Sequence, residues 1–301
     1  MTKKYFLTFS SFLMIAFLLG CVPSAPPALK PASPHAVADD AQPVVIDTDM
    51  AADDWLAILY LLGRSDVDIR AITVTGAGEA HCPAGTQNAR NLVALAGRPE
   101  IPVACGRETP LEGEHVFPRE WREGVDDLLG LTLPENSNEV SNESAVALLA
   151  QILQSSPQKV HLITLGPLTN LGELLKAEPN LVANIEMITI MGGAVEAAGN
   201  VGSSSNIAND VAEWNIYVDP RAAAEVFQSG APITLVPLDA TNDVPLTMDF
   251  YKRLEKDRTT SVAEFVYRVL AAQEENLRSG WYYFWDPLAA AIATDETLGT
   301  M

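Results

Sequence analysis

Short β-rich runs alternate with longer helix-like segments from Pro43 onward, and this alternation constrains the fold more than any other feature. Strands that alternate with helices form a parallel sheet, because each parallel connection must cross one face of the sheet. The expected strands are 44–46, 69–74, 160–165, 187–191 and 233–236. The expected helices are 55–62, 86–96, 144–154, 168–177, 220–227 and 261–277. We therefore predict one α/β domain over residues 43–301, with a Rossmann-like, mostly parallel central sheet and helices on both faces.

The chain is strongly acidic, with 39 Asp and Glu residues against 19 Lys and Arg residues and a formal net charge of −20. A nucleic-acid-binding protein needs a basic surface to neutralise phosphates, so we exclude a nucleic-acid partner. Direct adsorption to anionic lipid is excluded for the same reason. A hydrophobic content of 48% is ordinary for a globular protein and excludes a wholly disordered chain. We expect a small-molecule partner and leave self-association open.

The first twenty residues have the pattern of an export signal. Lys3 and Lys4 precede an apolar run over 6–19, which suits the hydrophobic region of a secretory signal better than a membrane-spanning helix. The run ends in the sequence LLGC at Cys21, which resembles a bacterial lipobox. That resemblance implies a signal peptide over 1–20 and lipidation of Cys21, whereas an ordinary signal peptide with an incidental cysteine is the alternative.

Residues 21–42 are rich in Pro and Ala and have no apolar period, so we predict an extended tether. The protein is then expected to be an exported lipoprotein that meets the membrane only through its lipid anchor, on the periplasmic or extracellular side. Export also makes a disulfide between Cys82 and Cys105 chemically possible, and the sequence neither requires nor excludes it.

Four carboxylates follow the first expected strand within a few residues of one another: Asp47, Asp49, Asp53 and Asp54. Such close like charges repel, and the first turn of the following helix relieves only part of the repulsion. A bound hard cation would relieve the rest. Calcium prefers oxygen ligands, whereas zinc prefers the His and Cys side chains that this loop lacks. A helix cap that uses Asp53 or Asp54 is the alternative, but it accounts for fewer than all four acids.

The motif that contains these acids, VVIDTDMAADDWLA, resembles the DTDxGxDD opening of the inosine-uridine-preferring nucleoside hydrolase family. Further blocks follow in the family's order: LGPLTN at 165–170, MGG at 191–193, EWN at 213–215, DP at 219–220 and WDP at 285–287. The resemblance implies hydrolysis of the N-glycosidic bond of ribonucleosides to free base and ribose, with Ca²⁺ as cofactor. Few residues follow the last block, whereas the family pattern continues, so we expect either a variant that is shortened at its C-terminus or an incomplete chain.

The resemblance also implies a role for each matching residue. Asp49 would bind calcium and act as the catalytic base for the attacking water. Asp54, Asp286 and the backbone carbonyl of Leu165 would complete the protein ligands. The family usually has Thr at this last position, but a main-chain ligand does not depend on the side chain.

Asp53, Glu213 and Asn215 would bind the ribose hydroxyls in this scheme. In the segment GAGE the family's usual Asn or Asp is missing, and Glu79 or Gly78 could take its place; we choose Glu79. Three asparagines, Asn200, Asn206 and Asn209, lie where one normally binds the 5′-hydroxyl, and the spacing to Glu213 favours Asn206.

The residues expected near the leaving base differ from those of much of the family, because Trp285 stands where many members have His. Trp214 and Trp285 instead resemble the purine-specific subgroup, in which two indoles sandwich the base and can stabilise its protonated form. The alternative is that Trp285 belongs to a hydrophobic patch within the aromatic run 281–285. The sequence therefore predicts a purine preference and leaves the proton donor open.

Two other functions fit parts of the pattern. A haloacid-dehalogenase-like phosphatase would use Asp47 and Asp49 as nucleophile and acid, with Asp239 and Asp243 as its later acidic pair. A non-catalytic nucleoside-binding lipoprotein would keep the pocket and lose the chemistry. Two departures from the family pattern allow this: Ala51 stands where the family has Gly or Asn, and Glu79 replaces the usual Asn or Asp. The phosphatase gives Asp53 and Asp54 no role, so we favour the hydrolase.

Overall fold

The computed structural model describes residues 30, 36–138 and 143–299. The expected signal peptide and the expected lipidation site at Cys21 lie outside these residues. The described chain forms one six-stranded sheet in which neighbouring strands run parallel in the order β3-β2-β1-β4-β5-β6. The strands are β1 (Gln42–Thr48), β2 (Val67–Val74), β3 (Val103–Cys105), β4 (Val160–Thr164), β5 (Ile185–Met191) and β6 (Ile233–Val236).

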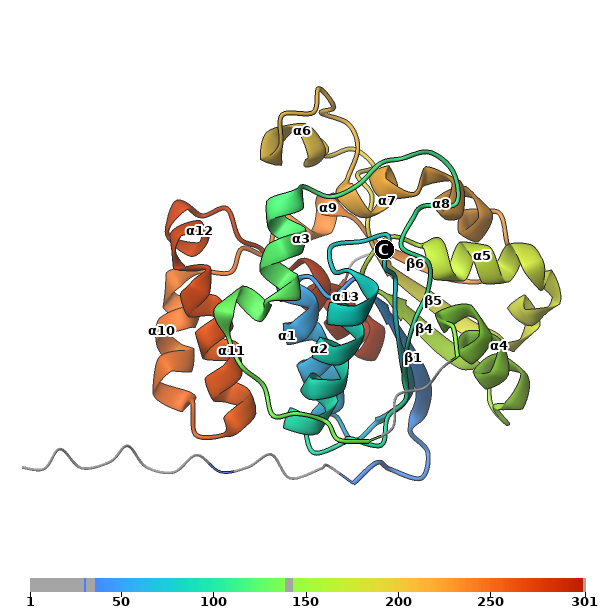
Figure 1. The fold of residues 1–301 in the computed structure, drawn as a ribbon, viewed down its shortest axis with the longest axis horizontal. Coiled ribbons are helices and arrows are strands. Elements are labelled where there is room, and N and C mark those ends of the chain that lie inside the picture. Colours follow the sequence, from blue (N-terminus) through green and yellow to red (C-terminus); the bar gives the residue numbers. More distant parts are fainter. Residues whose placement is uncertain (1–29, 31–35, 139–142, 300–301) are drawn as a thin grey trace, which may run out of the picture.

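Helices cover both faces of the sheet, as predicted (Figure 1). One face packs against α1 (Ala52–Leu62), α2 (Cys82–Leu95) and α13 (Trp285–Thr294), with α10 (Met248–Asp257) and α11 (Ser261–Ala272) outside them. The other face packs against α4 (Ala145–Ser155), α5 (Thr169–Ala177) and α8 (Pro220–Phe227). The pleat of β1 explains the division, because Val44 and Ile46 enter the first core while Val45 enters the second.

The strand order places a crevice above the centre of the sheet. From β1 the chain proceeds outward through β2 and β3, and from β4 it proceeds in the opposite direction through β5 and β6. At such a reversal, the loops that follow the two central strands separate and leave room for a ligand. The N–H of Leu165, just after β4, donates to the carbonyl of Asp47 in β1 over 2.8 Å, so these two strand ends are joined directly beneath the crevice.

Short elements surround the carboxyl ends of the strands. They are α3 (Arg119–Asp126), α6 (Val201–Ser204), α7 (Trp214–Val218), α9 (Leu238–Thr241), α12 (Glu274–Ser279) and a 3₁₀ turn at Leu128–Gly130. Two other 3₁₀ turns lie elsewhere, at Pro179–Asn184 before β5 and at Glu296–Leu298 after α13. The single helix expected over 261–277 is two helices, because Gln273 leaves the helical conformation between α11 and α12. This break gives the second helix a separate direction next to the crevice.

A disulfide joins Cys82, the first residue of α2, to Cys105, the last residue of β3. The pairing that the sequence left open is therefore present. No helix among the described residues is both long and apolar enough to cross a bilayer.

Candidate active site

A tight turn after β1 places the acidic loop over the crevice. Met50 adopts a left-handed φ of 62°, which is unusual for a residue with a side chain. Two hydrogen bonds hold this backbone: its N–H donates to Oγ1 of Thr48 over 2.9 Å, and its carbonyl accepts from Nε1 of Trp55 over 2.9 Å. Thr48 also donates to Oδ1 of Asp54. The turn therefore brings the end of β1 and the first turn of α1 to the same side of the sheet.

Asp49 is the acid at the bend of this turn, and backbone surrounds it closely. Its carboxylate accepts from the N–H of Glu79 over 3.1 Å and from the N–H of Ala51 over 3.4 Å. Gly78 and Gly166 pack against its side chain so tightly that a Cβ on either would overlap it. Burial raises the pKa of Asp49 to about 7, although the Glu79 N–H opposes the rise. The carboxyl group is thus fixed in position while it still lines a cavity.

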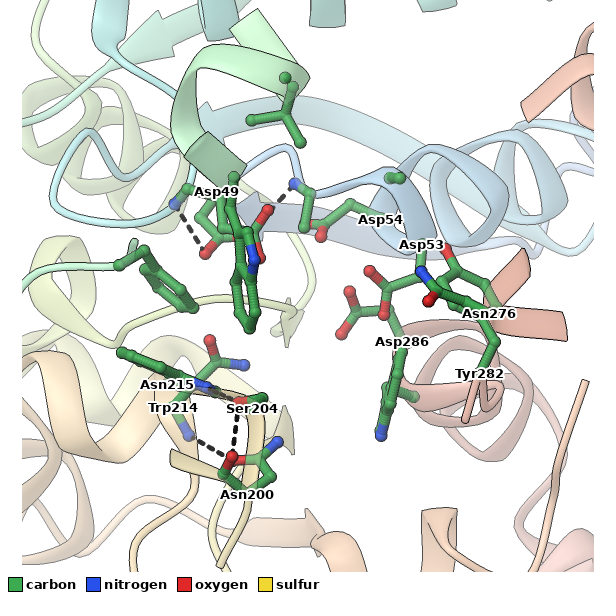
Figure 2. Close-up of a pocket in the computed structure, with 18 of the residues that line it drawn as sticks. Asp49, Asp53, Asp54, Asn200, Ser204, Trp214, Asn215, Asn276, Tyr282 and Asp286 are labelled. Carbon is green, nitrogen blue, oxygen red and sulfur yellow. Dashed lines mark hydrogen bonds between the residues drawn. The ribbon is translucent and has the colours of Figure 1, made fainter. Parts of the chain in front are cut away.

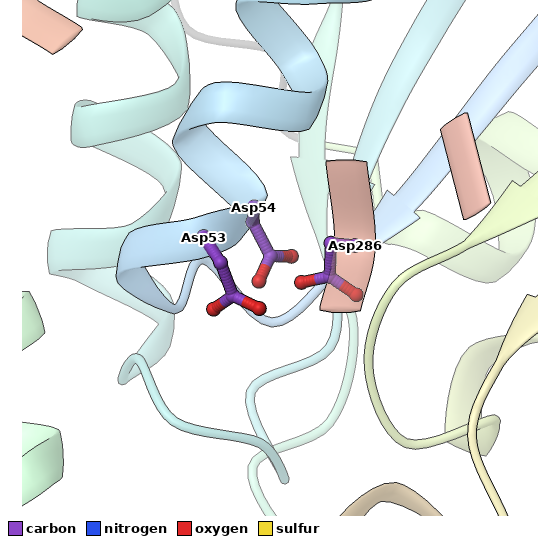
Figure 3. Close-up of side chains that lie close together, drawn as sticks. All are labelled: Asp53, Asp54 and Asp286. Atoms are coloured by element: carbon purple, nitrogen blue, oxygen red, sulfur yellow. The ribbon is translucent and has the colours of Figure 1, made fainter. Parts of the chain in front are cut away.

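Asp53, Asp54 and Asp286 form a compact carboxylate cluster in which one oxygen of each lies within 4.8 Å of the others (Figure 3). The first two come from α1, and the third comes from the first turn of α13, far away in the sequence. Burial first, and then the charge of the neighbouring acid, raises the pKa of both Asp54 and Asp286 well above the usual range for a carboxyl.

The carboxylate cluster fits a hard cation. Oδ2 of Asp54 and Oδ1 of Asp286 are buried without a hydrogen-bond partner anywhere in the described chain. Buried carboxylate oxygens are normally satisfied by donors or by a metal ion. An all-oxygen set of this kind suits calcium or magnesium and does not suit zinc.

The structure places the four expected metal ligands at the same cavity but only two of them in the cluster. Asp49 remains outside the cluster, since its oxygens face backbone N–H groups, and Asp53 stands in the cluster beside Asp54 and Asp286. The carbonyl of Leu165 lines the cavity and accepts from Nδ2 of Asn215 over 3.3 Å. A carbonyl has two lone pairs, so this contact leaves one for a cation.

The cavity beside the cluster has a volume of about 600 Å³, and four of the expected sugar-binding residues line it: Glu79, Asp53, Glu213 and Asn215. Asp53 and Asn215 are labelled in Figure 2. Glu213 caps α7 by accepting from the N–H groups of Asn215 over 2.9 Å and Ile216 over 3.2 Å, and it also accepts from the N–H of Gly193 over 2.8 Å. Asn215 donates through its side chain to the carbonyl of Met191 over 3.2 Å. These hydrogen bonds join the loop after β5 to the start of α7 and hold Glu213 and Asn215 in place at the cavity.

The structure corrects the choice of Asn206 for the sugar 5′-hydroxyl. Asn206 is exposed and is not among the residues that line the cavity, whereas Asn200 is. Oδ1 of Asn200 accepts from the backbone N–H of Trp214 over 3.1 Å. The short helix α6, which projects from the body of the molecule in Figure 1, carries the chain away from the cavity before Asn206 is reached. Counting residues back from Glu213 could not reveal this excursion.

Aromatic rings form two walls of the cavity. Trp214 stacks on Phe117 at 5.0 Å between ring centroids and meets Trp121 edge-on at 5.5 Å. On the other side, Trp285 contacts Tyr282 at 5.4 Å and Trp281 at 6.0 Å. Both predicted tryptophans, Trp214 and Trp285, therefore line the cavity.

Sequence reasoning missed Phe117, Trp121, Asn276 and Tyr282 as lining residues. The segment that holds Phe117 and Trp121 carries no strong periodic pattern, so nothing in it indicated α3. The aromatic run 281–285 did offer a signal for Tyr282.

The lining of the cavity contains acids, amides and aromatic rings but no Lys, Arg, His or Cys among the described residues. His81 pairs with Asp126 over 2.7 Å, and His115 stacks on Tyr217 at 4.0 Å between ring centroids. Neither imidazole therefore supplies the missing proton donor in this geometry. The absence of a cationic side chain also disfavours a phosphorylated ligand.

Asp47 does not face the cavity, which counts against the phosphatase alternative. Its carboxylate is buried and accepts from Oγ1 of Thr73 over 2.6 Å and from Nδ2 of Asn170 over 2.8 Å. A phosphatase nucleophile must reach its substrate, and this oxygen instead ties β1 to β2 and α5. Asp239, one of the other acids in that alternative, accepts from three backbone N–H groups over 195–197.

Known proteins resemble the chain over nearly all of its described length. The family profile of the inosine-uridine preferring nucleoside hydrolases matches residues 44–301. The pyrimidine-specific ribonucleoside hydrolase RihA of Salmonella arizonae is 38% identical over 229 residues, which are 75% of this chain and 70% of that protein.

Solved structures share the fold. The plant nucleoside hydrolase PpNRh1 is 30% identical with a TM-score of 0.75, over 86% of this chain and 80% of that one. The purine-preferring ribonucleoside hydrolase of Gardnerella vaginalis is 28% identical with a TM-score of 0.71, over 86% and 82% of the two chains.

Proposed function

Because the chain belongs to the inosine-uridine preferring nucleoside hydrolase family, we propose that it is a calcium-dependent enzyme that cleaves ribonucleosides to free base and ribose. The observation that carries the proposal is the pair of unpartnered buried oxygens on Asp54 and Asp286, two residues that line a cavity of about 600 Å³. These atoms need a ligand that the protein itself does not supply. A divalent cation together with a sugar diol meets that need.

Asp49 is the base in this proposal, and its surroundings suit the task. The carboxylate is held by backbone donors on two sides, so it cannot rotate away from a water molecule placed in the cavity. It takes a proton from that water as the water attacks the anomeric carbon. Asp54, Asp286, the carbonyl of Leu165 and Asp49 would hold the calcium ion, which when bound supplies the positive charge that makes the water more acidic.

The remaining acids of the cavity stabilise the sugar as the glycosidic bond breaks. The transition state of such reactions carries positive charge on the sugar ring, and fixed carboxylates nearby lower its energy. Glu79, Asp53 and Glu213 all line the cavity, and no cationic side chain opposes them there. Their oxygens also accept hydrogen bonds from the ribose hydroxyls. No covalent nucleophile is needed in this scheme.

We propose purine nucleosides as the preferred substrates. The two aromatic walls, with Trp214 on one side and Trp285 on the other, offer stacking area for a bicyclic base and stabilise a protonated one. The relatives differ on this point, because RihA is named pyrimidine-specific and the Gardnerella protein purine-preferring. Pyrimidine nucleosides are therefore the second candidate class, favoured by the 38% identity to RihA.

A spectrophotometric assay over inosine, guanosine, adenosine, uridine and cytidine, with and without a calcium chelator, tests the proposal. Base release should be fastest for the purines and should stop on chelation. Asp49→Ala should lose turnover by several orders of magnitude, while Asp257→Ala, which removes an exposed acid at the end of α10, should not change it. Chelator-resistant turnover would refute the calcium dependence, and faster release from uridine would refute the purine preference.

We also propose that Cys21 carries a lipid that holds the enzyme to a membrane outside the cytoplasm. The support is the pattern of basic residues, apolar run and LLGC at the start of the chain. Labelling with a radioactive fatty acid in a bacterial host should mark the full-length chain and should fail for Cys21→Ser. A labelled Cys21→Ser variant would refute the proposal.

A further inference from the structure

Tyr282 occupies a fixed place beside the carboxylate cluster. The backbone around it is extended and pairs with the segment before α10, where the N–H of Leu246 donates to the carbonyl of Tyr282 over 2.8 Å. Side chains alternate along an extended segment, so Tyr282 turns inward and is 5% exposed, whereas Tyr283 turns to the other side. The ring of Tyr282 rests edge-on against Trp285 at 5.4 Å between centroids.

The hydroxyl group of Tyr282 is buried without a hydrogen-bond partner in the described chain. The residue nevertheless lines the cavity, together with Asp53 and Asp286, and Figure 2 shows these three on the same side of it. A buried hydroxyl that makes no hydrogen bond destabilises the folded protein, so such groups usually have a partner. A ligand bound in the cavity could therefore provide the hydrogen-bond partner of the Tyr282 hydroxyl.

The chemistry around the hydroxyl narrows the choice of partner. Burial, and then the charges of Asp53, Glu79, Asp286 and Asp54, raise the pKa of Tyr282 well above its usual value, so the group is a donor at neutral pH. The carboxylates nearby only accept hydrogen bonds when ionised. A sugar hydroxyl bound among them donates its own proton to a carboxylate and leaves its oxygen free to accept.

We propose that the Tyr282 hydroxyl donates a hydrogen bond to the oxygen of the ribose 2′- or 3′-hydroxyl and is therefore a further substrate-binding residue. The 5′ end of the sugar is a poorer partner, because Asn200 and Ser204 lie across the cavity from Tyr282 (Figure 2). The inference rests on the proposed nucleoside hydrolysis and adds a neutral hydroxyl donor to the acidic sugar site.

Tyr282→Phe tests the inference, with Tyr283→Phe as the matched control. Both changes delete one phenolic oxygen from adjacent residues that contact Trp285, but only Tyr282 lines the cavity. The kcat/KM of Tyr282→Phe on inosine should fall about tenfold to a hundredfold, the usual effect of losing one buried hydrogen bond. Tyr283→Phe should match the wild type. The melting temperature of Tyr282→Phe should not fall, since the deleted oxygen has no partner in the protein.

Nucleosides that lack one sugar hydroxyl show which hydroxyl of the ribose Tyr282 contacts. We would measure kcat/KM for inosine, 2′-deoxyinosine, 3′-deoxyinosine and 5′-deoxyinosine with the wild type and Tyr282→Phe. The penalty for removing the contacted hydroxyl, 2′ or 3′, should shrink about tenfold in Tyr282→Phe, while the 5′ penalty stays unchanged. Equal penalties in both proteins for every substrate would overturn the role of Tyr282. Absence of base release from any nucleoside by the wild type would refute the proposed function itself, so the two failures are distinguishable.

Discussion

Arg122 joins the helix α3 to the loop 76–79, and replacing Arg122 tests whether this contact holds the loop in position. Its side chain is almost fully buried, with 8% of it exposed. Nη2 donates to the carbonyl of Gly76 over 2.9 Å, and Nε donates to the carbonyl of Glu79 over 3.2 Å. The N–H of Glu79 in turn donates to Asp49. One guanidinium therefore supports both Glu79, a proposed sugar-binding residue, and the proposed base.

The geometry sets the expected magnitude for Arg122→Gln. Each hydrogen bond from a charged donor contributes about 1.5–3 kcal/mol, and an amide can replace part of one of them. We therefore expect the free energy of unfolding to fall by about 3 kcal/mol, which lowers the melting temperature by about 6–12 °C for a domain of this size. The loop 76–79 loses its outer support, so kcat should fall at least tenfold as Asp49 loses its fixed orientation.

Arg119→Gln is the control, because Arg119 lies on the same helix and its removal changes the charge equally. Its side chain is 87% exposed and pairs only with Glu123 among the described contacts. Arg122→Lys keeps the charge without the planar fork and should fall between the wild type and Arg122→Gln. Thermal unfolding and kcat on inosine would be measured for all three. A melting temperature of Arg122→Gln equal to that of Arg119→Gln would refute the reasoning.

Three further outcomes follow from the site and the core. Gly78→Ala should remove most of kcat, because the added Cβ would overlap the side chain of Asp49. Gly63→Ala, at the end of α1, adds a Cβ away from Asp49 and should change kcat little. Equal kcat values for the two variants in steady-state kinetics would contradict this prediction. Removing calcium should lower the melting temperature by about 5–10 °C, as expected for loss of a ligand present at a hundred times its Kd, and no shift in differential scanning fluorimetry would contradict a bound cation. Burial lowers the pKa of His161 to about 4, so the unfolded chain takes up the proton first and stability should fall as the pH drops from 6.5 towards 4, by about 2–3 kcal/mol at pH 4.5. Urea unfolding of His161→Gln should lack that part of the decrease, and an equal decrease would contradict it.

The central sheet could be predicted from the sequence because its strands are buried runs of apolar residues. Five of the six strands lie where the β-rich runs indicated them. The strand β3 has only three residues, and its pairing with β2 gives it an extended form that three residues alone do not encode. The long amphipathic pattern over 261–277 hid the break at Gln273, since apolar periodicity continues across it.

In the candidate site, too, some residues could be predicted from the sequence and others could not. Residues of one short motif, such as Glu213 with Asn215, could be identified from the resemblance to the family, and they line the same cavity. Contacts that depend on distant segments could not. Trp121 reaches the cavity only because α3 packs on α2 and carries it there.

The acids of the first loop show why burial alone does not identify a ligand-binding group. Asp47 and Asp54 are both buried carboxylates of the same short motif. Asp47 has protein donors in Thr73 and Asn170, and burial raises its pKa to about 6. Asp54 keeps one oxygen without any partner. The acid with protein donors therefore holds the strands together, and the acid that lacks one and lines the cavity is the one we propose as a ligand-binding group. Of the buried side-chain atoms without a partner in the described chain, those of Asp54, Asp286 and Tyr282 belong to residues that line the cavity, whereas those of Thr75, Asn170 and Thr241 do not. This distinction requires three-dimensional contacts that no sequence spacing supplies.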